Sequence, residues 1–207
     1  MKKQMIFICL LNTLMIMVNA QSIGIKTGFT LAEGIYKLYL TEIPTSSLTG
    51  FPIGISADIP VSGSFYLNSG LLFIKKGTGA DISLAEEKIR VRYLEIPINI
   101  MYKFDFVTWK LFAQAGPYVD IGMYTRIKQE NDKEKVKLGP ESDEFKRMDY
   151  GINFGSGIEI DPVQVGISYG FGFVNVSNFS SETLRNRIFT ISVVYSLKDL
   201  FSRIRRY

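Results

Sequence analysis

The chain has 207 residues, with 24 Lys and Arg against 20 Asp and Glu, one Cys and no His. A single cysteine excludes a disulfide framework and a thiolate metal site, and the absence of histidine excludes Ser-His nucleophilic catalysis. The net charge of +4 is not arranged as a basic stripe with interleaved aromatics, so nucleic acid is not an expected partner.

The N-terminal segment, residues 1–20, forms a unit of its own. Lys2 and Lys3 precede an apolar run from Met5 to Val18, and small residues follow. This order is typical of a secretory signal peptide, with cleavage expected between Ala20 and Gln21. No later segment holds the ~20 consecutive apolar residues of a membrane helix.

Eight later segments alternate between large apolar and small or polar side chains, the two-residue period of a β-strand. In chain order they cover residues 23–31, 53–59, 65–73, 91–102, 109–123, 148–160, 163–173 and 189–197. The pattern is clearest in the sixth and seventh, where Asp161-Pro162 predicts a tight turn between antiparallel partners. Pro97 predicts a local defect in the fourth, because proline cannot donate to the ladder.

The connections between these segments are alternately long and short. Residues 32–52, 75–90, 124–147 and 174–187 form long connections, and residues 60–64, 103–108 and 161–162 form short ones. The pattern predicts an all-β fold: an eight-stranded antiparallel up-and-down transmembrane β-barrel, with short periplasmic turns and long extracellular loops. Residues 35–40 are too apolar for a solvated tip, so we expect the first strand to extend past the membrane; the alternative is a partner surface.

The direction of the apolar face separates two kinds of barrel. A soluble, lipocalin-like barrel would turn that face inward around a ligand. Here the polar face is rich in glycine, which has no benefit on a solvated strand but makes room inside a narrow lumen for residues such as Tyr66 and Tyr118. Aromatics also fall near both ends of the segments, as at a membrane interface. We therefore expect Ile98, Ile152 and Ile167 to face lipid.

Polar side chains of the opposite parity are expected in the lumen. They are Lys26, Asp58, Asn68, Glu95, Asn99, Gln114, Asn153, Glu159 and Gln164. Lys26 is the expected cation for Glu95, Asp58 or Glu159, because buried charges need partners. Since eight strands leave an interior that side chains fill, we expect a hydrogen-bonded plug; the alternative is an ion path or ligand site. Without an evident substrate entry, neither an enzyme nor a bound cofactor is expected.

Several short motifs carry a family resemblance. They are Tyr93-Leu94-Glu95-Ile96-Pro97, Ala115-Gly116-Pro117-Tyr118, Asp149-Tyr150-Gly151, Gly155-Ser156-Gly157-Ile158-Glu159 and Asn186-Arg187. With them the chain resembles the PorT-like outer-membrane β-barrel family, a Bacteroidetes-type domain, over nearly all of residues 21–197. The resemblance implies an eight-stranded barrel in the cell outer membrane. The family's namesake takes part in type IX protein secretion.

These observations lead to one expected organisation and role. Residues 1–20 form the signal peptide, 21–197 the barrel and 198–207 a basic tail. The expected function is a structural or interaction role at the cell surface; the alternatives are a component of a type IX secretion system and a narrow channel or small-ligand binder. The expected partners are the lipid bilayer, lipopolysaccharide, which the charged loop 126–147 could contact, the barrel-assembly machinery and secretion-complex proteins.

Overall fold

The computed structural model describes residues 22–38, 41–82, 85–129, 132–134, 138–139, 145–178 and 182–197. The expected signal peptide and the tail 198–207 lie outside the described residues. Among those that are described, there is no helix of the length and hydropathy needed to cross a bilayer.

Eight long strands form the wall of the molecule. They are β1 (Ser22–Leu38), β5 (Ile53–Ser62), β6 (Phe65–Ile82), β7 (Ala85–Asp105), β8 (Lys110–Gln129), β10 (Met148–Ile160), β11 (Val163–Gly172) and β12 (Glu182–Ser196). Each is antiparallel to its neighbours in the order β1, β5, β6, β7, β8, β10, β11, β12. The ring closes between β12 and β1, from Gly24 opposite Ser196 to Leu38 opposite Glu182. The described part of the chain therefore confirms the expected eight-stranded up-and-down barrel.

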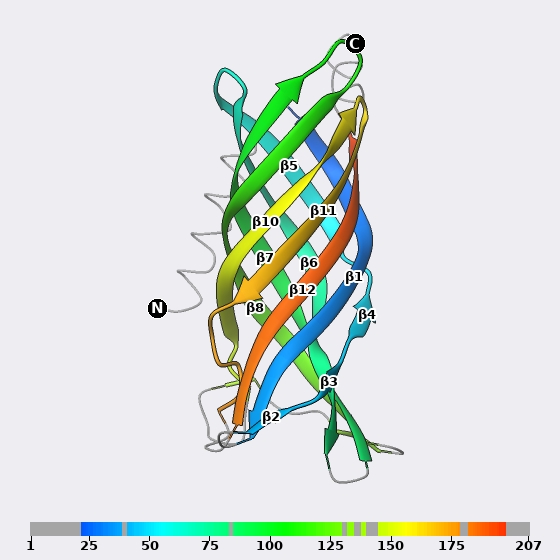
Figure 1. Cartoon of the computed structure of the whole chain (residues 1–207), viewed down its shortest axis with the longest axis vertical. Coiled ribbons are helices and arrows are strands. Elements are labelled where there is room, and N and C mark those ends of the chain that lie inside the picture. The colour runs from blue at the N-terminus through cyan, green and yellow to red at the C-terminus, as the bar shows by residue number, and fades with distance from the viewer. Residues whose placement is uncertain are drawn as a thin grey trace.

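The two ends of the barrel differ (Figure 1). The short connections, including the Asp161-Pro162 turn, lie at the top of that view. At the other end lie β2 (Thr41–Ile43) and β3 (Thr45–Ser46), which pair with β1 and β6. A third short strand, β4 (Leu48–Gly50), lies along the side of the barrel and pairs with the middle of β1. The fourth, β9 (Asp132–Glu134), pairs with β8. We call these the short-turn end and the loop end.

Strand lengths depart from the sequence prediction. The long connection predicted at residues 75–90 is wrong, because these residues continue β6 and β7, paired from Lys75 opposite Arg92 to Ile82 opposite Ala85. Parts of the other long connections are also strand, at residues 124–129 and 182–188. The expected extension of the first strand is confirmed, since β1 continues to Leu38.

The physical reason is an inversion of polarity along the wall. Toward the short-turn end the outward side chains are apolar, and Ile98 and Ile167 are 44% and 51% exposed. Toward the loop end apolar side chains also point inward and charged ones point outward: Ile74 and Val91 are buried, while Arg92 is exposed. In β6 and β7, the part toward the short-turn end thus suits lipid outside, and the part toward the loop end suits water outside.

A β-bulge in β8 changes which parity points inward. Arg92 pairs with Tyr124 and Tyr93 with Gly122, so Met123 is an extra residue. Beyond it Thr125 is buried and Tyr124 is exposed, the reverse of the parity before it. The predicted defect at Pro97 is also present, because the β6–β7 ladder lacks partners between Ser69–Ile98 and Leu72–Glu95.

Candidate functional site

The lumen is the candidate site, and a buried lysine organises its half nearer the loop end. Lys76 extends inward from β6, and its side chain is fully buried. Its Nζ lies 2.8 Å from Glu95 Oε2 on β7 and 2.6 Å from Asp120 Oδ2 on β8, and 4.0 Å from the centre of the Tyr118 ring. Two carboxylates and an aromatic face compensate for the loss of water around the ammonium group.

A hydrogen-bonded amide and carboxylate lie next to this cluster in the lumen. Asn186 Nδ2 on β12 donates to Asp149 Oδ2 on β10 at 2.8 Å, and both side chains are buried. Tyr93 is fully buried on β7. The Lys76 cluster, defined as Lys76, Glu95, Asp120 and Tyr118, is therefore bordered by Asp149, which lies directly across the β8–β10 ladder from Asp120, and is linked through it to Asn186 on β12.

A second lysine organises the short-turn end of the lumen. Lys103 Nζ on β7 lies 2.7 Å from Asp58 Oδ2 and 2.6 Å from Glu159 Oε2. Gln164 Nε2 donates to the same two oxygens at 2.8 and 3.0 Å, and Asn68 Nδ2 donates to Asp58 Oδ1 at 2.7 Å. This Lys103 cluster joins five strands, β5, β6, β7, β10 and β11, into one hydrogen-bonded layer.

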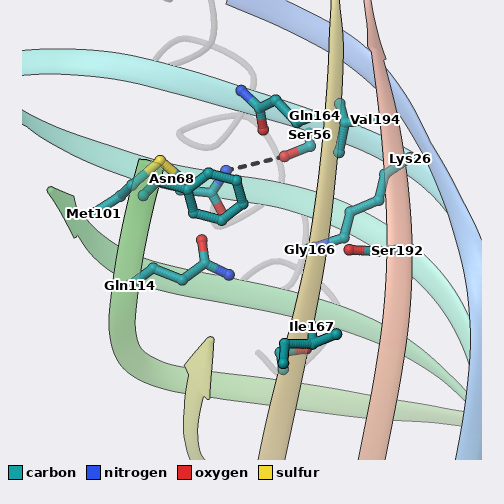
Figure 2. Close-up of a pocket in the computed structure, with 12 residues that line it drawn as sticks. Lys26, Ser56, Asn68, Met101, Gln114, Gln164, Gly166, Ile167, Ser192 and Val194 are labelled. Atoms are coloured by element: carbon teal, nitrogen blue, oxygen red, sulfur yellow. Dashed lines mark hydrogen bonds between the residues drawn. The ribbon is translucent and has the colours of Figure 1, made fainter. Parts of the chain in front are cut away.

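Between the clusters the lumen contains a small cavity (Figure 2). Lys26, Ser56, Gln114 and Gln164 line it together with Asn68, whose Nδ2 donates to Ser56 Oγ at 3.1 Å. Its volume is ≈ 10 Å³, and a second cavity at the Lys103 cluster measures ≈ 20 Å³. Space of this size holds about one water molecule. The lumen is therefore packed at this level.

Large side chains fill the space that glycines leave on neighbouring strands. A Cβ at Gly166 would lie 3.0 Å from Phe112 Cζ, and one at Gly170 would lie 3.7 Å from Tyr118 Cε1. The expectation that lumen glycines accommodate Tyr118 agrees with this geometry. A glycine-to-alanine change beside Phe112 would require that ring to move.

Two of the long connections close the loop end. Phe145 and Val176 are 1% and 0% exposed, and they pack with Tyr36, Ile89 and Leu184 of the strands. The Lys146 amide donates to the Val176 carbonyl at 2.8 Å, which holds the two segments together. We call this group the apolar cap.

The residues that the sequence assigns to the lumen all lie on the inner face of the wall. Asp58, Asn68 and Asn99 are buried, and Glu95 and Glu159 belong to the ion-pair clusters. Gln114 lines the cavity of Figure 2, and Asn153 is half-buried on β10 opposite Gly170.

The predicted role of Lys26 needs correction. Glu95 pairs with Lys76, whereas Asp58 and Glu159 pair with Lys103. Lys26 lines the cavity, and no ion pair within 4 Å joins it to a described carboxylate. Glu95 and Glu159 lie on β7 and β10, which do not border β1. Asp58 lies on the neighbouring strand β5 but opposite Ser22, whereas Lys26 lies opposite Gly54.

Sequence reasoning missed Lys76 and Lys103, although a usable signal was present. Lys76 continues the inward parity of Asn68 on β6, and Lys103 continues that of Asn99 on β7. Both lie just beyond the predicted strand ends at Phe73 and Tyr102. Extending the alternation past those ends would have placed both lysines inside.

A closed antiparallel barrel with an apolar outer wall and a packed, charged lumen defines the class of small outer-membrane β-barrel proteins. The chain belongs to the family described as outer membrane protein beta-barrel domain, whose model matches residues 19–178, more than half of the chain. The protein is therefore a small barrel of the cell outer membrane.

Several solved structures are similar to this chain at low sequence identity. The outer membrane protein OprG from Pseudomonas aeruginosa is 10% identical with a TM-score of 0.50, and the similarity covers 86% of this chain and 96% of OprG. Neisserial surface protein A is 13% identical with a TM-score of 0.46, covering 84% and 96%. Ail of Yersinia pestis is 11% identical with a TM-score of 0.40, covering 84% and 97%. The search of curated proteins returned no match.

Proposed function

We propose that this protein is a non-conducting outer-membrane barrel with a structural or interaction role at the cell surface. The observation that carries the proposal is the blocked lumen. The apolar cap closes the loop end, and the Lys76 and Lys103 clusters fill the interior below it. Side chains that interlock across a narrow eight-stranded barrel leave no path for hydrated ions. The wall and the loops then remain as the working surfaces.

Conductance in a planar bilayer tests the proposal. We expect the purified full chain to give no unitary current steps beyond those of the bare bilayer, while a large porin reconstituted in the same way gives clear steps. Reproducible, ion-selective steps would support the narrow channel or small-ligand binder instead.

A second candidate is a component of a type IX (PorT-like) secretion system. The motif Tyr93-Leu94-Glu95-Ile96-Pro97 supports it, because this is the most specific part of the resemblance to the Bacteroidetes-type PorT family. In the barrel, Glu95 of this motif binds Lys76, a structural use that any barrel could share. Co-purification of secretion proteins from mildly solubilised membranes would favour this candidate, and secretion genes beside this one would strengthen it.

The organisation and partners expected from the sequence belong to the same proposal. The signal peptide 1–20 would direct export to the periplasm, where the mature chain meets the assembly machinery. Outward Tyr195 on the last strand, 54% exposed, is a suitable aromatic signal for that machinery. The tail 198–207 is proposed to contact a periplasmic partner or lipid headgroups. Deleting residues 199–207 should leave the barrel folded and remove the partner; a block in assembly would instead assign the tail to the insertion signal.

A further inference from the structure

Three basic side chains on the outer wall have no acidic partner among the residues that the structure describes. Lys75 on β6 lies directly across the ladder from Arg92 on β7, and Arg90 is the next outward residue of β7. None of the three forms an ion pair with a carboxylate among the described residues. Like charges opposite each other destabilise a strand pair, so stability of the fold does not explain this cluster.

The three side chains are held against the wall rather than free in water. The Arg92 guanidinium lies 4.9 Å from the centre of the Tyr124 ring, and a Cβ at Gly50 would lie 3.4 Å from Lys75 Cε. Lys75 and Arg90 are half-buried, and the Arg90 Nε is buried without a hydrogen-bond partner among the described groups. A partly desolvated guanidinium is suited to a phosphate, which it can bind through two parallel hydrogen bonds.

The cluster lies at the level where the apolar wall ends. Toward the short-turn end, the next outward residue after Lys75 is Phe73, 56% exposed, and the next after Arg92 is half-buried Leu94. Along β7 the apolar outward residues run from Leu94 to Phe104. At about 3.4 Å per residue and a tilt of about 40°, this segment rises ~26 Å, close to the ~25 Å apolar band of outer-membrane barrels. The three cations therefore lie at headgroup depth.

We propose that Lys75, Arg90 and Arg92 form a binding site for the phosphorylated headgroup of a glycolipid in the outer leaflet. The two guanidinium groups hold one phosphate, and the Lys75 ammonium adds a point charge beside it. Phe73 and Ile53, which face each other across the β5–β6 ladder and are both exposed, supply an apolar strip for the acyl chains. Long loops face outward in this class of barrel, which places the site in the outer leaflet.

The opposite wall provides a comparison. On β12, Arg187 lies across the ladder from Glu33 of β1, so that side has a balancing carboxylate. Arg185 is the next outward residue of β12 and is exposed. It supplies a matched control at the same end of the barrel. The site rests on the outer-membrane location and is independent of whether the lumen conducts.

Thermal unfolding of the full chain in vesicles tests the site. Phosphatidylcholine vesicles are compared with the same vesicles containing diphosphoryl lipid A or lipid A stripped of both phosphates, and with plain vesicles plus inorganic phosphate. We expect diphosphoryl lipid A to raise the unfolding midpoint of the wild type and of Arg185→Gln by about 5 °C, as a ligand specific to the folded state does. The triple variant Lys75→Gln, Arg90→Gln, Arg92→Gln should lose that shift and keep its midpoint in plain vesicles.

Three outcomes would overturn the site. They are a full shift in the triple variant, an equal shift with phosphate-free lipid A, and an equal shift with inorganic phosphate alone, which would mean a small-anion site. If the triple variant does not fold, Arg92→Gln decides: loss of most of the shift supports the site, and an unchanged shift refutes it. The wild-type comparison of the two lipid A forms needs no variant.

Discussion

Lys103 illustrates how single residues hold this lumen together. Its ammonium group is 3% exposed and is shared by Asp58 and Glu159, while Gln164 donates to the same oxygens. Ions removed from water in this way contribute little net stability as a set, because desolvation offsets their attraction. Removing one member is costly, since the others then remain buried and uncompensated.

The change Lys103→Met should therefore lower the free energy of unfolding by about 3 kcal/mol, because two carboxylates lose their cation. Lys110→Met is the matched control: its ammonium lies 3.7 Å from Glu159 on a side chain 38% exposed, so a loss below about 1 kcal/mol is expected. Urea titration in vesicles measures both. Equal losses for the two lysines would contradict the buried network.

Outward residues of the mid-wall test the lipid-facing assignment. Ile167→Arg should cost about 2–4 kcal/mol, because a guanidinium then lies in hydrocarbon. Ile98→Arg and Ile152→Arg should behave alike. Val61→Arg, at a position 68% exposed in the last residues of β5 before the short turn, should cost at most about 1 kcal/mol. Unfolding in vesicles compares the variants, and wild-type stability of Ile167→Arg would show that the position does not face lipid.

At the scale of whole strands, the sequence predicted the strands correctly where the outward side chains are apolar and the inward side chains are polar. Between Phe65 and Phe73 of β6 the alternation is apolar outside and polar inside, and the predicted strand is present. From Leu72 onward inward residues become apolar, and Lys75 is the first outward charge. A search for one polarity pattern therefore ends the predicted strand at Phe73, whereas β6 continues to Ile82. Lys76, the centre of a buried cluster, lies in the part of the strand that was not predicted.

Other features of the strands depend on contacts that the sequence does not specify. The bulge at Met123 reverses the parity of β8, and no local motif marks it. Phe145 and Val176 come from loops, so their place in the apolar cap depends on how two distant connections meet. Lys26 was assigned to nearby charges by parity alone, which gives the face of a side chain but not its neighbours across the barrel.

The β6–β7 hairpin can be shortened without loss of the barrel, because strands need only ~9–11 residues to cross the membrane, whereas these have 18 and 21. Thr78 faces Ile89 across the ladder, so an Asn-Gly turn can replace residues 79–88. We expect this variant to fold and insert in vesicles. The matched control joins Ser69 to Ile98, which also face each other across the ladder, by the same turn; it removes part of the apolar wall and should prevent insertion.

At the scale of the molecule, ring closure is the dominant constraint. β1 and β12 pair from Gly24 opposite Ser196 to Leu38 opposite Glu182, so the wall has no free edge along this seam. Strand hydrogen bonds in a closed ring lie out of reach of competing water in lipid. Their cooperative loss should make the barrel resistant to detergent at room temperature.

We therefore expect the folded protein to migrate on a detergent gel at a different apparent mass before and after boiling. The Ser69-to-Ile98 variant is the unfolded control and should migrate identically in both states. Identical mobility of the boiled and unboiled wild type would contradict a closed barrel.

The polarity inversion between Phe73 and Lys75 also fixes the position of the barrel along the membrane normal. A shift of one outward position, two residues, corresponds to ~5 Å of height at a tilt of about 40°. A shift of the barrel by that step toward its short-turn end would place Lys75 and Arg92 in hydrocarbon. A shift by the same step toward the loop end would move the outward residues at the level of Phe65 away from the edge of the opposite leaflet and leave that leaflet poorly covered. Both displacements are unfavourable, so in a thinner or thicker bilayer the surrounding lipid has to adjust its thickness to the barrel.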